Sequence, residues 1–322
     1  MTFNKILDNG KIVGNYTIER YLETGGLSCM YLAKDHSSKR VVIKIPGECV
    51  DEAQTTPLTY DEVTDKNKPD VISYNSYPTE VFLKKMNGFL RYKNISHEEI
   101  NRIFKEEYKK LRIDSNVIVS PIDLIKFEDT NALVLPYSAG KNLREHIKNL
   151  QRVPTNIFYQ ISQELKKFTN TGFYHGDIKP ENIIIMRNKS VKLINPSVKF
   201  DLEDVRVIIA TPDYNPLLLE NGKADIMAIG ITMYELFTGI LPFKPTPWKH
   251  AGKNLVGESL NRELEFYLSI TPISDIKTND NKNPKLLLKD LETVINKCLN
   301  PFKHYCHTEL SDDLHTILYK QD

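Results

Sequence analysis

Apolar and polar positions alternate along the first third of the chain, in segments rich in β-branched and aromatic residues. Three segments have this pattern: residues 16–24, 29–35 and 40–46. The stretches between them contain Gly25-Gly26 and the polar run 36–40. Alternation interrupted by turn-type residues is typical of antiparallel strands. We therefore expect a three-stranded meander, followed by a polar loop or insertion over residues 47–78.

Helical spacing of the apolar residues begins after this insertion and dominates the second half of the chain. It predicts helices over residues 78–90, 96–113, 142–150, 154–170, 223–238, 258–268 and 285–299. In the helix 96–113, Ser96 is placed as an N-cap and acidic residues occupy the first turn. Residues 116–138 return to a strand pattern, with a turn at 128–131. A small sheet followed by a mainly helical half is therefore predicted.

This order predicts an α+β fold of two lobes. The N-terminal lobe, residues 1–136, is expected to hold a small antiparallel β-sheet, one helix and an insertion over 47–90. The C-terminal lobe, residues 137–322, is expected to be large and mostly α-helical. We assign both lobes to a single domain, residues 1–322.

Composition narrows the function classes. The 322 residues are 40% hydrophobic and 26% charged, with a net charge of +1, as in an ordinary globular protein. A near-neutral balance argues against a dedicated nucleic-acid or membrane-surface binder. The four cysteines form no CxxC pair, so reduced thiols are expected, and no apolar stretch approaches the length of a membrane span. A soluble, cytoplasmic protein without a membrane span follows.

The segment 174–185, YHGDIKPENIII, carries the clearest chemistry. Transfer of a phosphoryl group to an alcohol needs a carboxylate for the hydroxyl proton, a cation near the γ-phosphate and an oxygen ligand for Mg²⁺. Asp177, Lys179 and Asn182 match these needs on one short loop. We call residues 174–185 the HGD loop.

With these residues the chain resembles the eukaryotic-type (Hanks-type) serine/threonine protein kinases, and the resemblance covers nearly its whole length. Residues 23–35 resemble the glycine-rich loop, 133–143 the hinge, and 210–219 the substrate-docking loop. The resemblance implies an ion pair between Lys44 and Glu107, and an Asp225 that holds the HGD loop. The nucleotide contacts that it implies are Gly25, Gly26, Ser28, Met30, Val42, Lys44, Leu135, Pro136, Ser138 and Ile184. Small-molecule kinases of the aminoglycoside and choline type also use an HGD loop, but usually lack the Lys-Pro-Glu-Asn continuation.

The largest departure from the family pattern lies at Asn195-Pro196-Ser197, where the family has Asp-Phe-Gly. The resemblance makes Asn182 and Asn195 the metal ligands, but Asn195 lacks the negative charge that Mg²⁺ prefers. Pro196 and Ser197 replace a packing ring and a flexible glycine, so we expect this segment to be fixed. The downstream acids Asp201, Glu203 and Asp204 either substitute for the missing carboxylate or form a solvated charge run.

Other positions depart as well. Glu23 occupies the first glycine position and either repels phosphates or is an exposed charge. Met30 and Val42 are bulkier than the family residues above the adenine. Either they fill the nucleotide site, or Met30 changes conformation and lets the adenine enter. The docking loop has Leu217 or Leu218 in place of a glutamate, and Cys306 is the nearest match to its arginine partner. Both halves of a buried ion pair are then lost together, which preserves the fold.

Three functions are consistent with this pattern. The first is a pseudokinase that regulates or scaffolds a protein partner. The second is an active, atypical serine/threonine kinase that transfers the γ-phosphate of ATP to protein hydroxyls. The third is an ATP-using enzyme with another outcome, such as nucleotidyl transfer. The resemblance implies ATP with Mg²⁺ or Mn²⁺ as cofactors, whereas the lost carboxylate argues against them, and we favour the pseudokinase. For the insertion, a docking or self-regulatory role and a plain surface loop both stay open.

Overall fold

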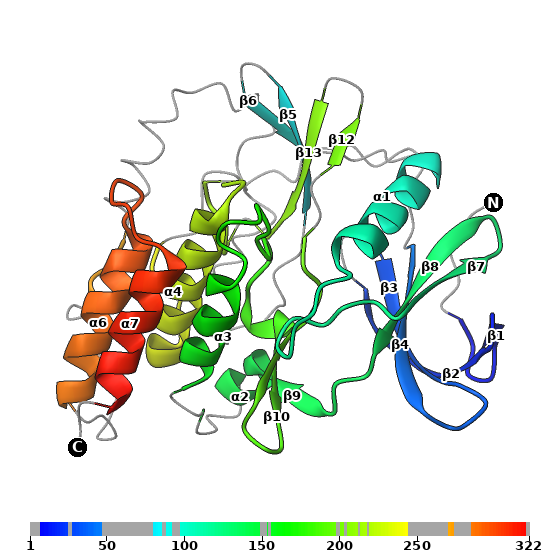
Figure 1. Cartoon of the computed structure of the whole chain (residues 1–322), viewed down its shortest axis with the longest axis horizontal. Helices are drawn as coiled ribbons and strands as arrows, with labels where there is room; N and C mark the ends of the chain where they lie inside the picture. Colours follow the sequence, from blue (N-terminus) through cyan, green and yellow to red (C-terminus); the bar gives the residue numbers. More distant parts are fainter. Residues whose placement is uncertain are drawn as a thin grey trace, which may run out of the picture.

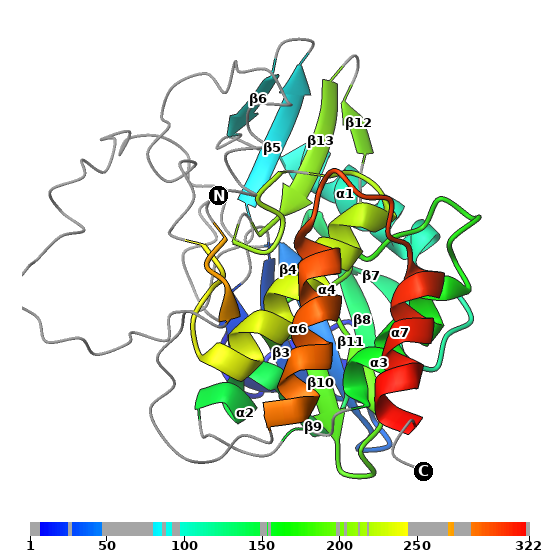
Figure 2. The same ribbon diagram turned by 90° about the vertical axis from the view of Figure 1, so that its left-hand side faces the viewer.

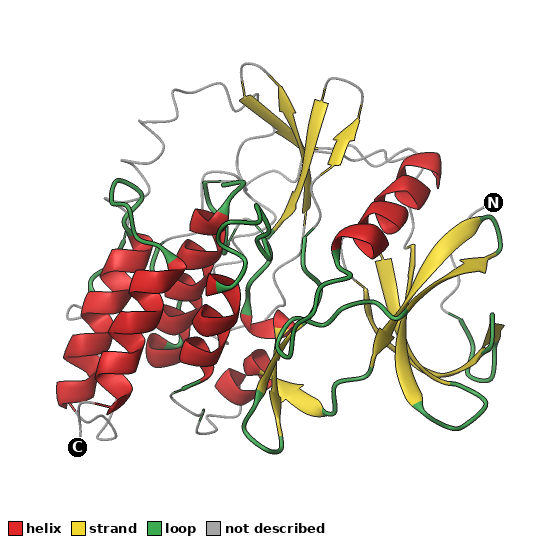
Figure 3. Cartoon of the chain, viewed as in Figure 1, coloured by secondary structure: helices red, strands yellow, loops and turns green. Residues whose placement is uncertain are grey.

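The computed structural model of the chain is shown in Figure 1. It describes residues 7–24, 28–46, 80–85, 88–91, 97–148, 153, 156–197, 200–202, 205–211, 213–217, 219–243, 270–273 and 285–319. The six-stranded sheet lies at one end of the molecule and most helices lie at the other (Figure 3), as expected for an α+β protein of two lobes.

The N-terminal lobe is built on an antiparallel sheet with the strand order β1-β2-β3-β4-β8-β7 (Figure 1). Its strands are β1 (Ile12–Val13), β2 (Tyr16–Thr24), β3 (Ser28–Lys34), β4 (Arg40–Pro46), β7 (Asp123–Phe127) and β8 (Thr130–Pro136). Burial alternates along β4, and Tyr31, Ile43 and Val134 belong to the core beneath the sheet. The predicted meander and the later strand pair are thus confirmed.

Helix α1 (His97–Lys110) packs against β8. Ile100, Ile103, Phe104 and Glu107 are buried at helical spacing, so one face of the helix meets the sheet. Acidic residues occupy its first turn and lysines its last, which complements the helix dipole. The predicted N-cap, Ser96, lies outside the described residues.

The C-terminal lobe is mainly helical (Figure 3). It contains α2 (Leu143–Lys148), α3 (Ile157–Lys166), α4 (Gly222–Thr238), α6 (Lys285–Leu299) and α7 (His307–Tyr319). A small sheet in the order β11-β10-β9 accompanies them, with β9 (Gly140–Asn142), β10 (Ile183–Met186) and β11 (Val191–Leu193). Four of the helices predicted for this lobe are confirmed within a few residues at each end. The predicted helix 258–268 lies outside the described residues, and α7 was not predicted.

Helix α4 is the centre of this lobe. Every residue from Ala224 to Glu235 is buried, as expected of a helix surrounded by protein. The side chain of Asn221 caps its start by accepting the Lys223 N–H, and Gly239 ends it in the left-handed region at φ 77°. This buried helix carries Asp225, which anchors the HGD loop.

One helix prediction was wrong. Residues 78–90 were expected to be helical, but the chain forms strands β5 (Glu80–Lys85) and β6 (Gly88–Arg91). They pair with β13 (Val205–Ala210) and β12 (Phe200–Leu202) in a sheet with the order β12-β13-β5-β6 (Figure 2). Pairing with a segment more than a hundred residues away outweighs the local helical spacing. The turn signal Asn87-Gly88 was overlooked in the sequence.

Candidate active site

The structure brings Lys44 of β4 and Glu107 of α1 into direct contact. The Lys44 Nζ lies 2.7 Å from Glu107 Oε1 and 2.8 Å from Oε2, and Glu107 is 4% exposed. The same Nζ lies 5.6 Å from the centre of the Phe104 ring. A two-oxygen contact at this depth fixes the lysine between the sheet and the helix.

The backbone of the HGD loop is held by one buried carboxylate. Asp225 accepts the His175 N–H through Oδ2 and the Gly176 N–H through Oδ1, each at 2.7 Å. Burial raises the pKa of Asp225 to about 7. The two hydrogen bonds act in the opposite direction, because they favour the charged form. Gly176 has φ 77°, and a Cβ there would lie 3.0 Å from the Ser197 Cβ. Only glycine fits this turn without strain.

Polar side chains converge on Asp177 at the centre of the loop. Thr211 Oγ1 donates to Asp177 Oδ1 at 2.6 Å, and Asn182 Nδ2 donates to Oδ2 at 2.9 Å. Lys179 Nζ donates to Thr211 Oγ1 at 2.9 Å and lies 3.5 Å from Asp177 Oδ2. All four residues are buried. The structure thus gathers the three HGD-loop residues singled out in the sequence and adds Thr211.

Asn195 lies beside this cluster in an unusual backbone conformation. Its φ of 55° is in the left-handed region, which asparagine tolerates better than most residues. Its Nδ2 donates to Asn182 Oδ1 at 3.3 Å, so a chain of amide hydrogen bonds runs from Asn195 through Asn182 to Asp177. Two amides that bond to each other occupy the positions implied for metal ligands.

The segment 195–197 is also tied to the HGD loop through the backbone. Ser197 N–H donates to the His175 carbonyl at 2.6 Å, and Ile194 N–H donates to the Asn182 carbonyl at 3.0 Å. The His175 ring Nε2 lies 3.1 Å from the Ile194 carbonyl, and burial lowers the pKa of this histidine to about 4. The neutral ring donates a hydrogen bond to that carbonyl, which adds a third contact between residues 194–197 and the HGD loop.

These residues do not fit Mg²⁺ well. The ion prefers charged oxygen ligands, whereas Asn182 and Asn195 offer neutral amides and Asn182 Oδ1 already accepts a hydrogen bond. Among the residues that the structure describes, no group of three or more His, Cys, Asp or Glu side chains could hold a metal ion. Of the three downstream acids, Asp201 lies on β12 in register with Arg206, and the other two lie outside the described residues.

The positions implied for the adenine come from strands of both lobes. Val42 of β4 is in register with Leu135 of β8, and Met30 of β3 with Lys44. Met30 is only 6% exposed and Leu135 7%, whereas Val42 and Ile184 are half-buried. Ser28 is buried, Pro136 exposed and Ser138 half-buried; Gly25 and Gly26 lie outside the described residues.

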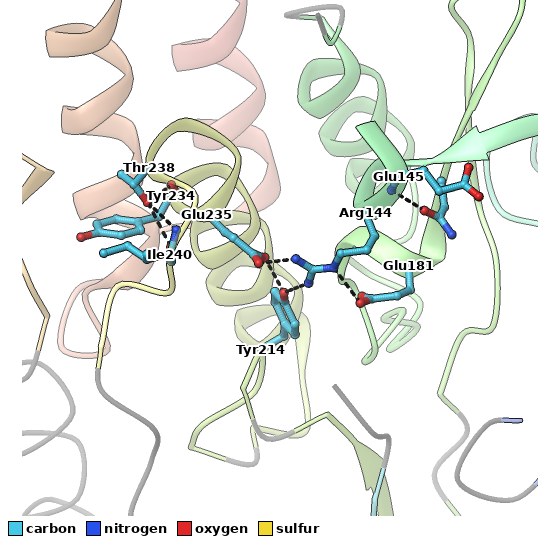
Figure 4. Close-up of polar contacts among 9 residues, drawn as sticks. Arg144, Glu145, Glu181, Tyr214, Tyr234, Glu235, Thr238 and Ile240 are labelled. Carbon is cyan, nitrogen blue, oxygen red and sulfur yellow. Dashed lines mark hydrogen bonds and ion pairs between the residues drawn. The ribbon is translucent and has the colours of Figure 1, made fainter. Parts of the chain in front are cut away.

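A buried ionic cluster beside the HGD loop was missed in the sequence (Figure 4). Arg144 of α2 donates from Nε to Glu181 at 2.8 Å, from one terminal nitrogen to Glu235, and from the other to the Tyr214 hydroxyl at 2.6 Å. Tyr214 also donates to Glu235. Burial alone would lower the pKa of Arg144, but Tyr214 and the two carboxylates raise it. The cluster joins α2, the HGD loop, the segment after β13 and α4.

At the position of the lost family ion pair, the structure shows apolar packing. Leu217 packs against the core of the C-terminal lobe, and Leu218 lies outside the described residues. The backbone N–H of Cys306 donates to Glu309 at the start of α7. Among the described residues, Cys29, Cys298 and Cys306 form no disulfide bond.

The fold and this site define a protein-kinase-like protein, and sequence comparison places the chain in that family. The profile of the protein kinase domain family matches residues 79–305, so the chain belongs to this family. None of the described helices is long and apolar enough to cross a bilayer.

Two curated relatives are named as serine/threonine-protein kinases. The chain is 24% identical over 246 residues to a probable serine/threonine-protein kinase, CPE1738, of Clostridium perfringens, covering 66% of this chain and 35% of the relative. It is 26% identical over 248 residues to serine/threonine-protein kinase PrkC of Bacillus subtilis, covering 72% and 32%. The chain therefore spans about a third of the length of these relatives.

A solved structure agrees on the fold. The kinase domain of Mycobacterium tuberculosis PknI superposes with a TM-score of 0.57 at 15% identity, covering 97% of this chain and 99% of that one. At this identity the likeness concerns the fold alone.

Proposed function

We propose that this chain is a pseudokinase, a kinase-fold protein that regulates or scaffolds a protein partner without efficient phosphoryl transfer. The observation that carries the proposal is the hydrogen bond that Asn195 Nδ2 donates to Asn182 Oδ1, which joins two neutral amides where the family places a metal-binding carboxylate. Positioning and charge neutralisation provide most of the acceleration in phosphoryl transfer. A site without a charged metal ligand loses much of both.

Two further features support this proposal. The three backbone and ring contacts between 194–197 and the HGD loop hold the segment in one conformation. Met30 is almost fully buried among the positions implied for the adenine, where a large side chain fills space. Both favour a fixed domain that acts through its surface.

An active, atypical serine/threonine kinase is the second candidate, favoured by one specific arrangement. Lys44 and Glu107 are paired, and Asp177, Lys179 and Thr211 are assembled. In that candidate ATP would supply the phosphoryl group, Lys44 and Lys179 would hold phosphate oxygens, and Asp177 would accept the proton of a substrate hydroxyl.

Nucleotide titration with and without metal separates the two candidates. The protein is titrated with ATP alone, with Mg²⁺ and with Mn²⁺, by calorimetry and thermal shift, and assayed for phosphotransfer beside Asp177→Asn. For the pseudokinase we expect no gain in ATP affinity from metal and no transfer above that of Asp177→Asn. Metal-dependent transfer that disappears in Asp177→Asn would establish the active kinase instead.

Introducing a carboxylate at position 195 tests directly whether the missing charge limits metal binding. Asn195→Asp should make ATP binding Mg²⁺-dependent, by about tenfold or more, because the site regains a charged oxygen ligand. Asn188→Asp is the matched control: it adds the same charge on the exposed turn between β10 and β11, and should change nothing. Equal behaviour of Asn195→Asp and Asn188→Asp would mean that the missing charge does not limit metal binding.

A further inference from the structure

Two hairpins that are far apart in the sequence form one sheet (Figure 2). The first hairpin, β5 and β6, lies between β4 and α1, and the second, β12 and β13, follows the 195–197 segment. Strands β5 and β13 pair antiparallel over five residue pairs, from Arg206 opposite Lys84 to Ala210 opposite Glu80. We call strands β5 and β6 together the insertion hairpin.

Strand β13 lies inside this sheet. It pairs with β12 on one side and with β5 on the other, so β12 and β6 form the edges. The insertion hairpin thus extends a strand of its own chain, in the way that an extended peptide adds to an exposed sheet edge. An isolated two-stranded hairpin is marginally stable in water, whereas four strands can support one another. Each hairpin therefore depends on the other.

The paired strand leads directly to the candidate active site. Ala210, the last residue of β13, is opposite Glu80, and the next residue is Thr211. Thr211 is 1% exposed, donates to Asp177 and accepts from Lys179. Its carbonyl accepts the N–H groups of Tyr214 and Asn215 at 2.9 Å. The position of β13 therefore determines where Thr211 meets Asp177.

We propose that the insertion hairpin is an internal strap on the candidate active site. By pairing with β13 it holds residues 205–211 and keeps the Thr211 hydroxyl on the Asp177 carboxylate. Release of the hairpin leaves β12 and β13 as a marginal two-stranded unit, loosens Thr211 and removes the Thr211 hydroxyl from the Asp177 carboxylate. This proposal goes beyond the proposed function, because the hairpin holds Thr211 on Asp177 whether or not the site transfers phosphate.

Disulfide cross-linking tests the pairing and its register. In Leu83→Cys/Val207→Cys the two cysteines face each other across β5 and β13, and mild oxidation should join them, as seen by peptide mapping. The matched control, Leu83→Cys/Ile209→Cys, moves one cysteine two residues along the same strand face, beyond the reach of a disulfide. Equal or preferred cross-linking in the control would overturn the proposal.

Hydrogen exchange tests the coupling to the site and needs no nucleotide. Leu83→Pro removes a ladder N–H from the interior strand β5, and amide exchange over residues 205–215 should become about tenfold faster or more. Oxidation of Leu83→Cys/Val207→Cys should slow exchange there relative to its own reduced form. If Leu83→Pro also accelerates amide exchange in α4, its effect is not confined to the strap. The comparison between the oxidised and reduced forms of Leu83→Cys/Val207→Cys then decides whether the pairing controls residues 205–215. Unchanged exchange over 205–215, or a change confined to 205–210, contradicts the strap and leaves the proposed function untouched.

Discussion

The contact between Lys44 and Glu107 shows what a buried charge pair does at the scale of single residues. Their side chains are 13% and 5% exposed. Because little water reaches them, each charge is stabilised mainly by the other. Arg40 and Glu19 form a comparable contact at 2.9 Å, but their side chains are 56% and 24% exposed. Water solvates this second pair, so its contribution to stability is small.

Lys44→Met should lower the free energy of unfolding by about 3–5 kcal/mol, because it leaves Glu107 buried without a cation. Lys44→Met/Glu107→Leu should recover much of this loss, since both charges are removed together. The surface control Arg40→Met should change stability by about 1 kcal/mol or less. Chemical denaturation measures all three, and a Lys44→Met loss no larger than that of Arg40→Met would contradict this account.

The sequence allowed prediction of some of these residues and not of others. Asp177 and Asn182 could be singled out because they stand in a short string whose residue types suit one chemistry, and Lys44 because its strand resembles the lysine strand of the kinase family. Arg144 could not, because its partners Glu181, Tyr214 and Glu235 lie 37, 70 and 91 residues away. No local pattern indicates that an arginine on a short helix will be buried among them.

At the scale of elements, close approach between helices depends on a single glycine. A Cβ on Gly230, in the middle of α4, would lie 2.6 Å from the Cys298 Cβ and 3.2 Å from Leu299 Cδ2, both on α6. A Cβ on Gly222, at the start of α4, would meet the His307 ring at ordinary distances, 3.6 Å from Nε2 and 3.8 Å from Cδ2. Alanine substitutions at the two positions therefore distinguish the effect of helix propensity from the effect of packing between α4 and α6.

Gly230→Ala should destabilise the protein by about 1–3 kcal/mol, because α6 must move away from α4. Alanine favours the helical conformation by about 1 kcal/mol over glycine, which offsets part of this effect. Gly222→Ala in the same helix should be close to neutral. Thermal unfolding of both variants measures the difference, and equal stability would mean that the α4–α6 contact relaxes freely.

Element prediction succeeded where neighbouring residues decide and failed where a distant partner decides. Strand β4 and helix α1 followed from alternation and helical spacing, because each buries one face against a lobe core. Residues 80–91 carry apolar positions compatible with either structure, and their pairing with β13 selects the hairpin. The α+β class was nevertheless predictable, because it rests on the majority of the elements.

At the scale of the whole molecule, buried ionisable groups make folding stability depend on pH. His307, at the start of α7, is 5% exposed and packs near Gly222 of α4, and burial lowers its pKa to about 4. An unfolded chain protonates this histidine near its usual pKa of 6.5. Between these two values the unfolded state binds a proton that the folded state rejects. Stability due to His307 is thus complete above pH 6.5 and is lost as the pH falls towards 4.

Comparing the wild type with His307→Gln isolates this effect. Between pH 6.5 and 4 the wild type should lose stability relative to the variant by roughly 1.4 kcal/mol per pH unit. Asp225, whose raised pKa acts in the opposite sense over this range, is present in both proteins and cancels in the difference. His304→Gln is the matched surface control, because the His304 side chain is 84% exposed. Urea unfolding across this range measures the difference, and parallel curves for wild type and His307→Gln would mean that His307 is protonated as readily in the folded protein as in the unfolded chain.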